Sequence, residues 1–325
     1  MLVQSIKRPL RGLRRHDLCR RIFTRKVLVF VALLFVMFGL VHADSATGET
    51  ILNIAAPAQI VVGEPLVVRV SIHNTASDTL MLIAYFDPPH GLVGISITDP
   101  SGNNFLGRGG IHSITWLASS REYWDRIPPG DSLYGYVTLM HFSVRPPNED
   151  GSVSFQLGEY VLRATYRFRE IEIRSNEARV LLIETPDNQV AAREVFISGN
   201  TPDWTLLFSS EESGWHGMPR MRVAWEEVAS TWPESIFGKY ALYYLARLEQ
   251  HLGNCDKAIE QYQRFLADYE GLPYSELAEV HIGECQAADR KQELELLLLL
   301  PEEYQRNAYV YHRVKWLKHE VEGRD

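Results

Sequence analysis

Residues 241–265 read ALYYLARLEQHLGNCDKAIEQYQRF and decide how the last third of the chain folds. Tyrosine, leucine and alanine recur in this stretch with the 3.6-residue period of an amphipathic helix. The pattern is interrupted once, at Gly253, where a turn is expected. We therefore predict two helices joined by a short turn.

The same pattern recurs at an offset of 37 residues. Laying Met221–Tyr240 over Ala258–Leu277 places Trp225 on Tyr262 and Val228 on Phe265, so large residues stay in register. This internal repeat predicts a partial helical hairpin at Pro219–Trp232, a complete one at Glu234–Tyr269, a degenerate one at Tyr274–Leu300 and a closing helix at Pro301–Glu322.

The stretch Ala241–Phe265 resembles a tetratricopeptide repeat, which is a pair of antiparallel helices with small residues where they cross. On this resemblance the packing positions are Leu245, Ala246, Gly253, Ala258, Tyr262 and Phe265. The sequence departs from the repeat at Glu249, where the family has tyrosine, and at Glu270, where it has a closing proline. The resemblance implies a helical array that binds proteins or peptides on a concave surface.

Residues 50–185 have a different character, with short β-branched runs separated by turn signals such as Pro128-Pro129-Gly130-Asp131. The strands that we predict are Ile51–Ala55, Leu66–His73, Thr79–Phe86, Val93–Thr98, Ser113–Leu117, Ser132–Met140, Glu159–Phe168 and Arg179–Glu184. Seven or eight short strands without a helical period indicate an antiparallel β-sandwich.

Several of these stretches resemble bacterial Ig-like domains, although residues 50–185 contain no cysteine. The stretches that carry the resemblance are IVVGEPL at 60–66, VRVSIHN at 68–74, IPPGDS at 127–132, GEYVLRATY at 158–166 and SNEARVL at 175–181. The predicted fold is thus multidomain. An all-β Ig-like sandwich over residues 50–185 precedes a linker at 186–202 and an all-α tetratricopeptide-like domain at 203–325. Within the linker, Val190–Ser198 is an alternative short strand.

The N-terminal segment is typical of an export signal. Between Lys7 and Lys26 it holds nine basic residues and one acidic residue, and Val27–Val41 is apolar and uncharged. Such a run is shorter than the roughly 20 residues of a spanning helix, which favours cleavage after Ala43. Two readings stay open: residues 1–43 are a cleaved signal peptide, or residues 27–43 anchor the chain in the inner membrane. Either places the rest outside the cytoplasm, in the periplasm or secreted.

The net charge limits the classes of binding partner that we expect. The whole chain carries −8, and because residues 1–43 are strongly basic the remainder carries −16. A chain this acidic is poorly suited to nucleic acid or anionic lipid, so we expect membrane contact only through an uncleaved N-terminal segment.

Two cysteines remain after the leader, which contains Cys19. Cys255 opens one predicted helix and Cys285 lies near the end of the next, and antiparallel neighbours bring such ends together. In an oxidising compartment Cys255 and Cys285 are therefore a candidate disulfide. The alternative is two buried thiols that pack as small apolar residues.

No motif predicts catalysis, cofactor binding or a metal site. The sequence lacks HExxH, CxxC, GxSxG, a phosphate loop and a dinucleotide fingerprint. The dispersed histidines, which we expect to be surface or core residues, are His90, His112, His141, His216, His251, His281 and His312.

The sequence therefore favours an exported, non-enzymatic protein that binds or scaffolds an unidentified protein or peptide. The alternative is an accessory subunit or inhibitor that regulates an extracytoplasmic hydrolase through the sandwich loops. Because fold alone does not fix function, the array supports binding only by analogy.

Overall fold

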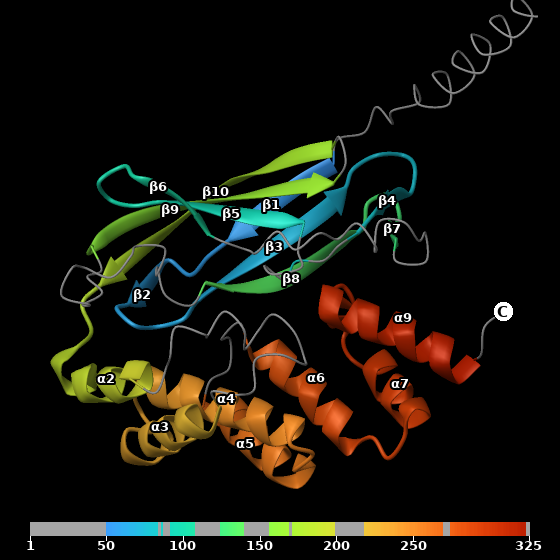
Figure 1. Ribbon diagram of the computed structural model, residues 1–325. Coiled ribbons are helices and arrows are strands. Elements are labelled where there is room, and N and C mark those ends of the chain that lie inside the picture. The colour runs from blue at the N-terminus through green and yellow to red at the C-terminus, as the bar shows by residue number, and fades with distance from the viewer. Residues whose placement is uncertain are drawn as a thin grey trace, which may run out of the picture. The chain divides into compact units, whose positions relative to one another are not determined.

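A computed structural model of the protein describes residues 50–83, 86, 92–107, 124–139, 156–168, 171–198, 218–268 and 274–322 (Figure 1). Residues 48–325 form one compact unit. The predicted leader at residues 1–43 and the predicted strand at Ser113–Leu117 lie outside the described residues.

The described strands form three sheets. The first has the order β1-β3-β8, the second β2-β10-β9-β5-β6 and the third β4-β7. Pairing is antiparallel except between β2 and β10, which run parallel. The strands are β1 (Thr50–Ala55), β2 (Gln59–Val61), β3 (Leu66–Asn74), β4 (Leu80–Leu82), β5 (Val93–Thr98), β6 (Asn104–Gly107), β7 (Asp125–Ile127), β8 (Ser132–Leu139), β9 (Gly158–Phe168) and β10 (Ile171–Ile183).

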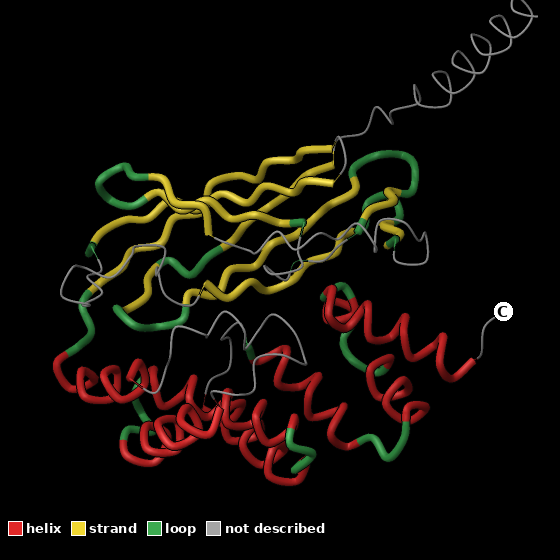
Figure 2. Tube along the Cα trace, in the orientation of Figure 1, coloured by secondary structure: helices red, strands yellow, loops and turns green. Residues whose placement is uncertain are grey.

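The helices follow the strands along the chain and lie on one side of them (Figures 1 and 2). Val190–Ser198, which the sequence left as linker or strand, is helical. The helices are η3 (Asp187–Gln189), α2 (Val190–Ser198), α3 (Met218–Thr231), α4 (Ile236–His251), α5 (Cys255–Asp268), α6 (Ser275–Gln286), α7 (Arg290–Leu298), α8 (Glu302–Gln305) and α9 (Ala308–Glu322).

Strand β3 buries one face along its length and the other face in part, at Val67. Its alternating residues Leu66, Val68, Val70 and Ile72 belong to the core between the two larger sheets. Val67 points the other way and belongs to the core of the helices, together with Tyr240 and Trp225. The β1-β3-β8 sheet is therefore the middle layer of three, with the five-stranded sheet on one face and helices on the other (Figure 1).

This arrangement corrects the predicted fold class. An all-β Ig-like sandwich followed by a separate all-α tetratricopeptide-like array is wrong, because the described residues form a mixed structure, about 46% helix and 31% strand, with small sheets. The physical reason lies in Val67 of β3 and in Tyr134 and Tyr136 of β8. These side chains are apolar or aromatic at outward positions where a free-standing sandwich would be polar, and the helices pack on them or accept their hydroxyls. The predictions of an Ig-like and a tetratricopeptide-like domain are therefore wrong as well.

Local signals did predict the helix pair α4–α5 correctly. The predicted pair at Glu234–Tyr269 corresponds to α4 and α5, and the turn between them contains Gly253 with a φ of 77°. This left-handed conformation favours glycine because it has no Cβ. Helix α4 begins after Ser235, whose hydroxyl accepts from the backbone N–H of Gly238 at 3.0 Å.

The closing helix is broken in two, at the place where the chain returns to the sheet. The N–H of Tyr134, in the edge strand β8, donates to the carbonyl of Arg306 at 3.0 Å, and Tyr134 forms a parallel bridge with Asn307. This contact interrupts the predicted helix over Pro301–Glu322 between α8 and α9. It also pairs a backbone group that an edge strand would leave open.

Helix α9 is then held on the small sheet. Ala308 joins the core between the sheets. The buried carboxylate of Asp125, in β7, pairs with His312 at 3.0 Å and with the amine of Lys315 at 3.4 Å. The last helix therefore packs on strands as well as on α7.

A membrane-spanning helix, which the N-terminal sequence suggested as one alternative, is not found among the described residues: each helix there is too short or too polar to cross a membrane. The segment at 27–43 that prompted the prediction lies outside them.

Candidate functional site

Helix α6 brings most of the chemistry-bearing side chains together. Its sequence, SELAEVHIGECQ, puts Glu276 and Glu284 two turns apart, with His281 and Cys285 beside the second. Residues separated by four or eight positions share one face of a helix. These side chains face neighbouring elements, and Glu276 and His281 are buried.

The first cluster joins α6 to strand β8, and we call it the seam cluster. It consists of Glu276, Tyr134, Tyr136 and Asn307. The Glu276 carboxylate accepts from the hydroxyls of Tyr134 at 2.5 Å and Tyr136 at 2.9 Å, and from the side-chain amide of Asn307 at 2.9 Å. Burial and the neighbouring Glu276 carboxylate raise the pKa of Tyr134 and of Tyr136, so both phenols stay protonated and donate.

Two further contacts extend the seam cluster. The guanidinium of Arg69 lies 3.6 Å from the centre of the Tyr134 ring, a cation–π contact on the helix-facing side of the sheet. The hydroxyls of Thr138 and Tyr274 lie 2.5 Å apart. Side chains at alternate positions of β8 thus fix the start of α6.

The second cluster lies among α4, α5, α6 and α9, and we call it the helix cluster. It consists of Glu284, His281, Arg247, Gln250, Tyr262 and Tyr309. The Glu284 carboxylate accepts from His281 Nδ1 at 2.8 Å, Gln250 Nε2 at 2.8 Å and the Tyr309 hydroxyl at 2.6 Å. Gln250 Oε1 in turn accepts from Tyr262 at 2.9 Å and Arg247 at 3.1 Å.

Charges in the helix cluster are strongly perturbed. Burial opposes ionisation of Glu284, but His281, Tyr309 and Arg247 outweigh it and lower its pKa to about 2. Burial and the Arg247 charge lower the pKa of His281 to about 4 against the pull of Glu284. At neutral pH the ring is therefore neutral. We assign its proton to Nδ1, because that atom faces the carboxylate.

Both candidate disulfide residues lie next to the helix cluster. Cys255 and Cys285 are free thiols in this structure, and each is partly buried. Burial, then a hydrogen bond with Cys255, raises the pKa of Cys285 to about 12. A thiol with this pKa is protonated near neutral pH and is a poor nucleophile.

Glu249, the position that departs from the tetratricopeptide pattern, is fully buried and joins three helices. Its carboxylate pairs with Arg222 of α3, and with Lys257 of α5 at 2.6 Å and Asn254 at 2.7 Å. Burial opposes its ionisation, but the bonds from Lys257 and Asn254 prevail and lower its pKa. An ion-paired carboxylate thus occupies the place of the expected aromatic ring.

The other residues singled out from the sequence have packing positions. Leu245, Ala246, Ala258, Tyr262 and Phe265 are buried, and Gly253 is exposed in its turn. The sequence did not reveal the roles of Glu276, Glu284 and Arg247, because acidic and basic residues on a helix usually indicate a solvated face. The spacing of Glu276 and Glu284 on α6 was the available signal.

Exposed apolar side chains occur at one end of the α3–α4 pair. Val223 is 62% exposed and Leu252 is 53% exposed. The ion pair between Arg222 and Glu249 brings the start of α3 beside the end of α4, so these two apolar side chains lie at the same end. We call Val223 and Leu252 the apolar pair.

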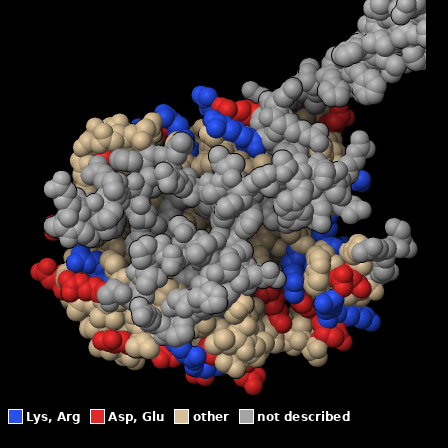
Figure 3. Space-filling model, viewed as in Figure 1, with Lys and Arg blue, Asp and Glu red and all other residues tan. Residues whose placement is uncertain are grey.

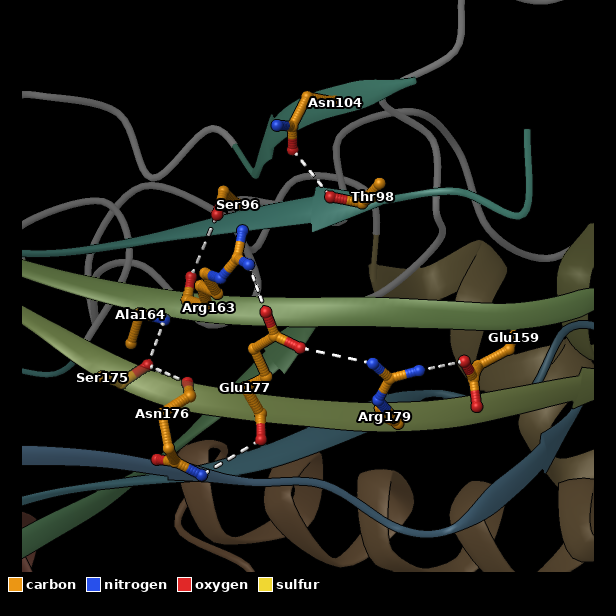
Figure 4. Close-up of polar contacts among 10 residues, drawn as sticks. All are labelled: Ser96, Thr98, Asn104, Glu159, Arg163, Ala164, Ser175, Asn176, Glu177 and Arg179. Carbon is orange, nitrogen blue, oxygen red and sulfur yellow. Dashed lines mark hydrogen bonds and ion pairs between the residues drawn. The ribbon is translucent and has the colours of Figure 1, made fainter. Parts of the chain in front are cut away.

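The outer face of β9 and β10 is charged, but its charges pair with one another (Figure 4). Arg163 pairs with Glu177, and Arg179 reaches Glu159 at 2.5 Å and Glu177 at 3.4 Å. Exposed pairs of this kind contribute about 0–1 kcal/mol each. Acidic and basic side chains are also interspersed over the helices in Figure 3.

Within the described ranges, no group of three or more histidine, cysteine, aspartate or glutamate side chains could hold a metal ion. Of the histidines considered above, His90, His112, His141 and His216 lie outside these ranges. So do most of the residues between β4 and β5, between β6 and β7 and between β8 and β9, which the hydrolase-regulator alternative would use.

Neither a protein-family profile nor a curated protein sequence matches the chain. Among solved structures, a β-glucosidase from Erythrobacter marinus is similar at 16% identity and a TM-score of 0.27, covering 42% of this chain and 16% of that one. A β-glucosidase from Listeria innocua is similar at 13% identity and a TM-score of 0.26, covering 43% and 17%.

The CARDB domain of the PF1109 protein from Pyrococcus furiosus is similar at 12% identity and a TM-score of 0.23, covering 42% of this chain and 89% of that domain. The chain thus spans less than a fifth of the two glucosidases that it resembles. At these TM-scores the likenesses carry no argument about function.

Proposed function

We propose that the chain is an exported, non-enzymatic protein that binds or scaffolds another protein. The observation that carries the proposal is how the buried charges are used. In the seam cluster and the helix cluster, the carboxylate oxygens accept hydrogen bonds from groups of other secondary elements. Such saturated groups position helices and leave little capacity to bind or activate a substrate.

The pKa values of Cys285 and Glu284 support the same proposal. A catalytic nucleophile or general base is tuned towards the working pH. Here the Cys285 thiol, with a pKa of about 12, and the Glu284 carboxyl, with a pKa of about 2, are tuned away from it. This pattern is typical of structural ion-pair networks.

For the contact surface we propose the apolar pair, Val223 and Leu252. Apolar side chains this exposed lose contact with water when a partner covers them, which favours association. Arg222 directly precedes Val223, and both Arg222 and Lys257 pair with Glu249. The partner is thus expected to be a protein or peptide with an apolar anchor. The acidity of the chain after residue 43 disfavours nucleic acid.

Affinity capture with the exported full chain tests this function. The double variant Val223→Asp/Leu252→Asp is compared with wild type and with the control Leu299→Asp, which changes a side chain that is 81% exposed on another helix pair. We expect the same partner with wild type and control and at least a tenfold loss with the double variant. Partner retention by the double variant would refute the surface, and turnover in a hydrolase screen would refute the non-enzymatic function.

A further inference from the structure

We propose that Cys255 and Cys285 form an intramolecular disulfide that ties the start of α5 to the end of α6. The inference rests on the proposed export for its oxidising environment. It goes beyond the binding function, because it assigns a covalent modification that the free thiols of this structure do not yet contain.

Side-chain contacts around the two cysteines bring them together. Gln250, near the end of α4, bonds Glu284 at 2.8 Å, and Glu284 directly precedes Cys285. The chain turns immediately after α4 and starts α5 at Cys255. One turn of α5 further on, Ala258 is part of the core that Cys285 packs against.

A ring contact fixes the same two helices along their length. The rings of Tyr262, in α5, and His281, in α6, lie 5.7 Å apart at their centres and are stacked. Tyr262 is seven residues after Cys255 and His281 is four residues before Cys285, so the cysteines lie beyond this contact in the same direction. The contact between α5 and α6 therefore puts both thiols at the same end of this helix pair.

Both cysteines are only partly buried, and their exposed part gives an oxidant access to them. The oxidant we name by class is the disulfide of a thiol–disulfide oxidoreductase. The Cys255 thiolate attacks it and forms a mixed disulfide, and one oxidant thiolate leaves. The Cys285 thiolate then attacks Cys255 Sγ and expels the second. Two thiols lose two protons and two electrons, and the oxidant becomes a dithiol.

Burial, and after it the neighbouring Cys255 thiol, keep Cys285 protonated. We therefore assign the first attack to Cys255 and the second, resolving attack to Cys285. The product fixes the end of α6 that carries Glu284, and hence the helix cluster.

Peptide mapping of purified full-length protein tests the bond independently of export. The protein is reduced, oxidised with glutathione disulfide, alkylated and digested with trypsin. We expect peptide 248–257 linked to peptide 265–290, with neither cysteine alkylated. Two alkylated cysteines, or glutathione left on either, would overturn the proposal. If the link forms in the purified protein but is absent from the cellular protein, the site stands and the export proposal fails.

Thermal unfolding measures the consequence. The disulfide would close a loop of about 30 residues, so its reduction should lower the midpoint of thermal unfolding by about 5–10 °C. The variant Cys255→Ser/Cys285→Ser should show no response to reductant, while wild type does. An equal response of wild type and variant would contradict the bond.

Discussion

The seam cluster and the helix cluster are built on the same helix, yet their carboxylates are satisfied differently. Glu276 receives its hydrogen bonds from two phenols and an amide, all neutral. Glu284 has the charge of Arg247 close by and His281 in direct contact. The first attaches α6 to a sheet, and the second attaches it to three other helices.

This difference teaches where the stability of the helical layer resides. When one member of a buried ion pair is removed, the charge of the other member is left unpaired. This costs more free energy than the loss of one hydrogen bond from a group that keeps several neutral partners. The helix cluster should therefore be the more sensitive of the two. The following variants test this order.

The largest effect is expected for Glu284→Gln. It leaves the buried Arg247 without its nearby negative charge, and we expect the free energy of unfolding to fall by about 3–5 kcal/mol in urea titrations. Glu295→Gln is the matched control, because that side chain is exposed on α7 and its pair with Lys291 is 4.0 Å long. The control should change stability by less than about 0.5 kcal/mol. A similar small change for Glu284→Gln would refute the ranking.

Glu276→Gln should cost less, about 2–3 kcal/mol, because hydrogen bonds to a charged acceptor are lost but no cation is stranded. The side-chain amide that replaces one carboxylate oxygen cannot accept from Tyr136. Glu302→Gln, on exposed α8, is the control. If Glu276→Gln destabilises the protein more than Glu284→Gln does, the comparison is inverted.

The His281 ring gives the helix cluster a pH dependence. Its folded pKa of about 4 is below the ordinary 6.5, so between these values the unfolded chain binds a proton that the folded chain does not. Stability is therefore lost as pH falls through this window. From pH 7.5 to pH 5.0 the free energy of unfolding should fall by about 2 kcal/mol less in His281→Gln than in wild type. Parallel pH profiles for wild type and variant would argue against the assignment.

A further carboxyl, that of Glu64, is partly buried between the β2–β3 turn and α4. It has one close donor, the N–H of Val61 at 3.0 Å, and the Tyr240 hydroxyl at 3.5 Å. Burial therefore dominates and raises its pKa to about 7. The folded protein favours the protonated carboxyl of Glu64. The contribution of this group to the free energy of unfolding is therefore fully present below pH 4.5 and is lost as pH rises through 7.

We expect Glu64→Gln to stabilise the protein at pH 8 by about 1 kcal/mol relative to wild type, since its partial exposure reduces the effect. The two proteins should be nearly equal at pH 4.5. An advantage that is the same at both pH values would contradict the raised pKa.

Much of the secondary structure could be predicted from the sequence. The alternation in LVVRVSIHN predicted β3, and Gly253 predicted the turn between α4 and α5. The short strands β2, β6 and β7 and the helix α2 were missed, because three or four residues give no period and AAREVF lies among turn-forming residues.

The layering could not be predicted, and the reason lies in a few side chains. Tyr134 and Tyr136 alternate with Gly135 and Val137, so they belong to the outward face of a sandwich. Nothing local indicates that this face is covered, because Glu276, which receives both hydroxyls, is 140 or more residues away. The sequence around Asn176, at the bulge in β10, likewise does not indicate its distant partner. Its side-chain amide exchanges two hydrogen bonds with the backbone of Ile54, at 2.9 and 3.1 Å, and joins the two larger sheets.

The central claim is that sheets and helices form one cooperative unit joined through α6. Calorimetric unfolding of the purified protein tests it most directly, with the helical signal at 222 nm and near-ultraviolet tyrosine signals followed in parallel. We predict a single transition with coincident midpoints and equal calorimetric and van't Hoff enthalpies. Two separate transitions, one for strands and one for helices, would contradict the claim.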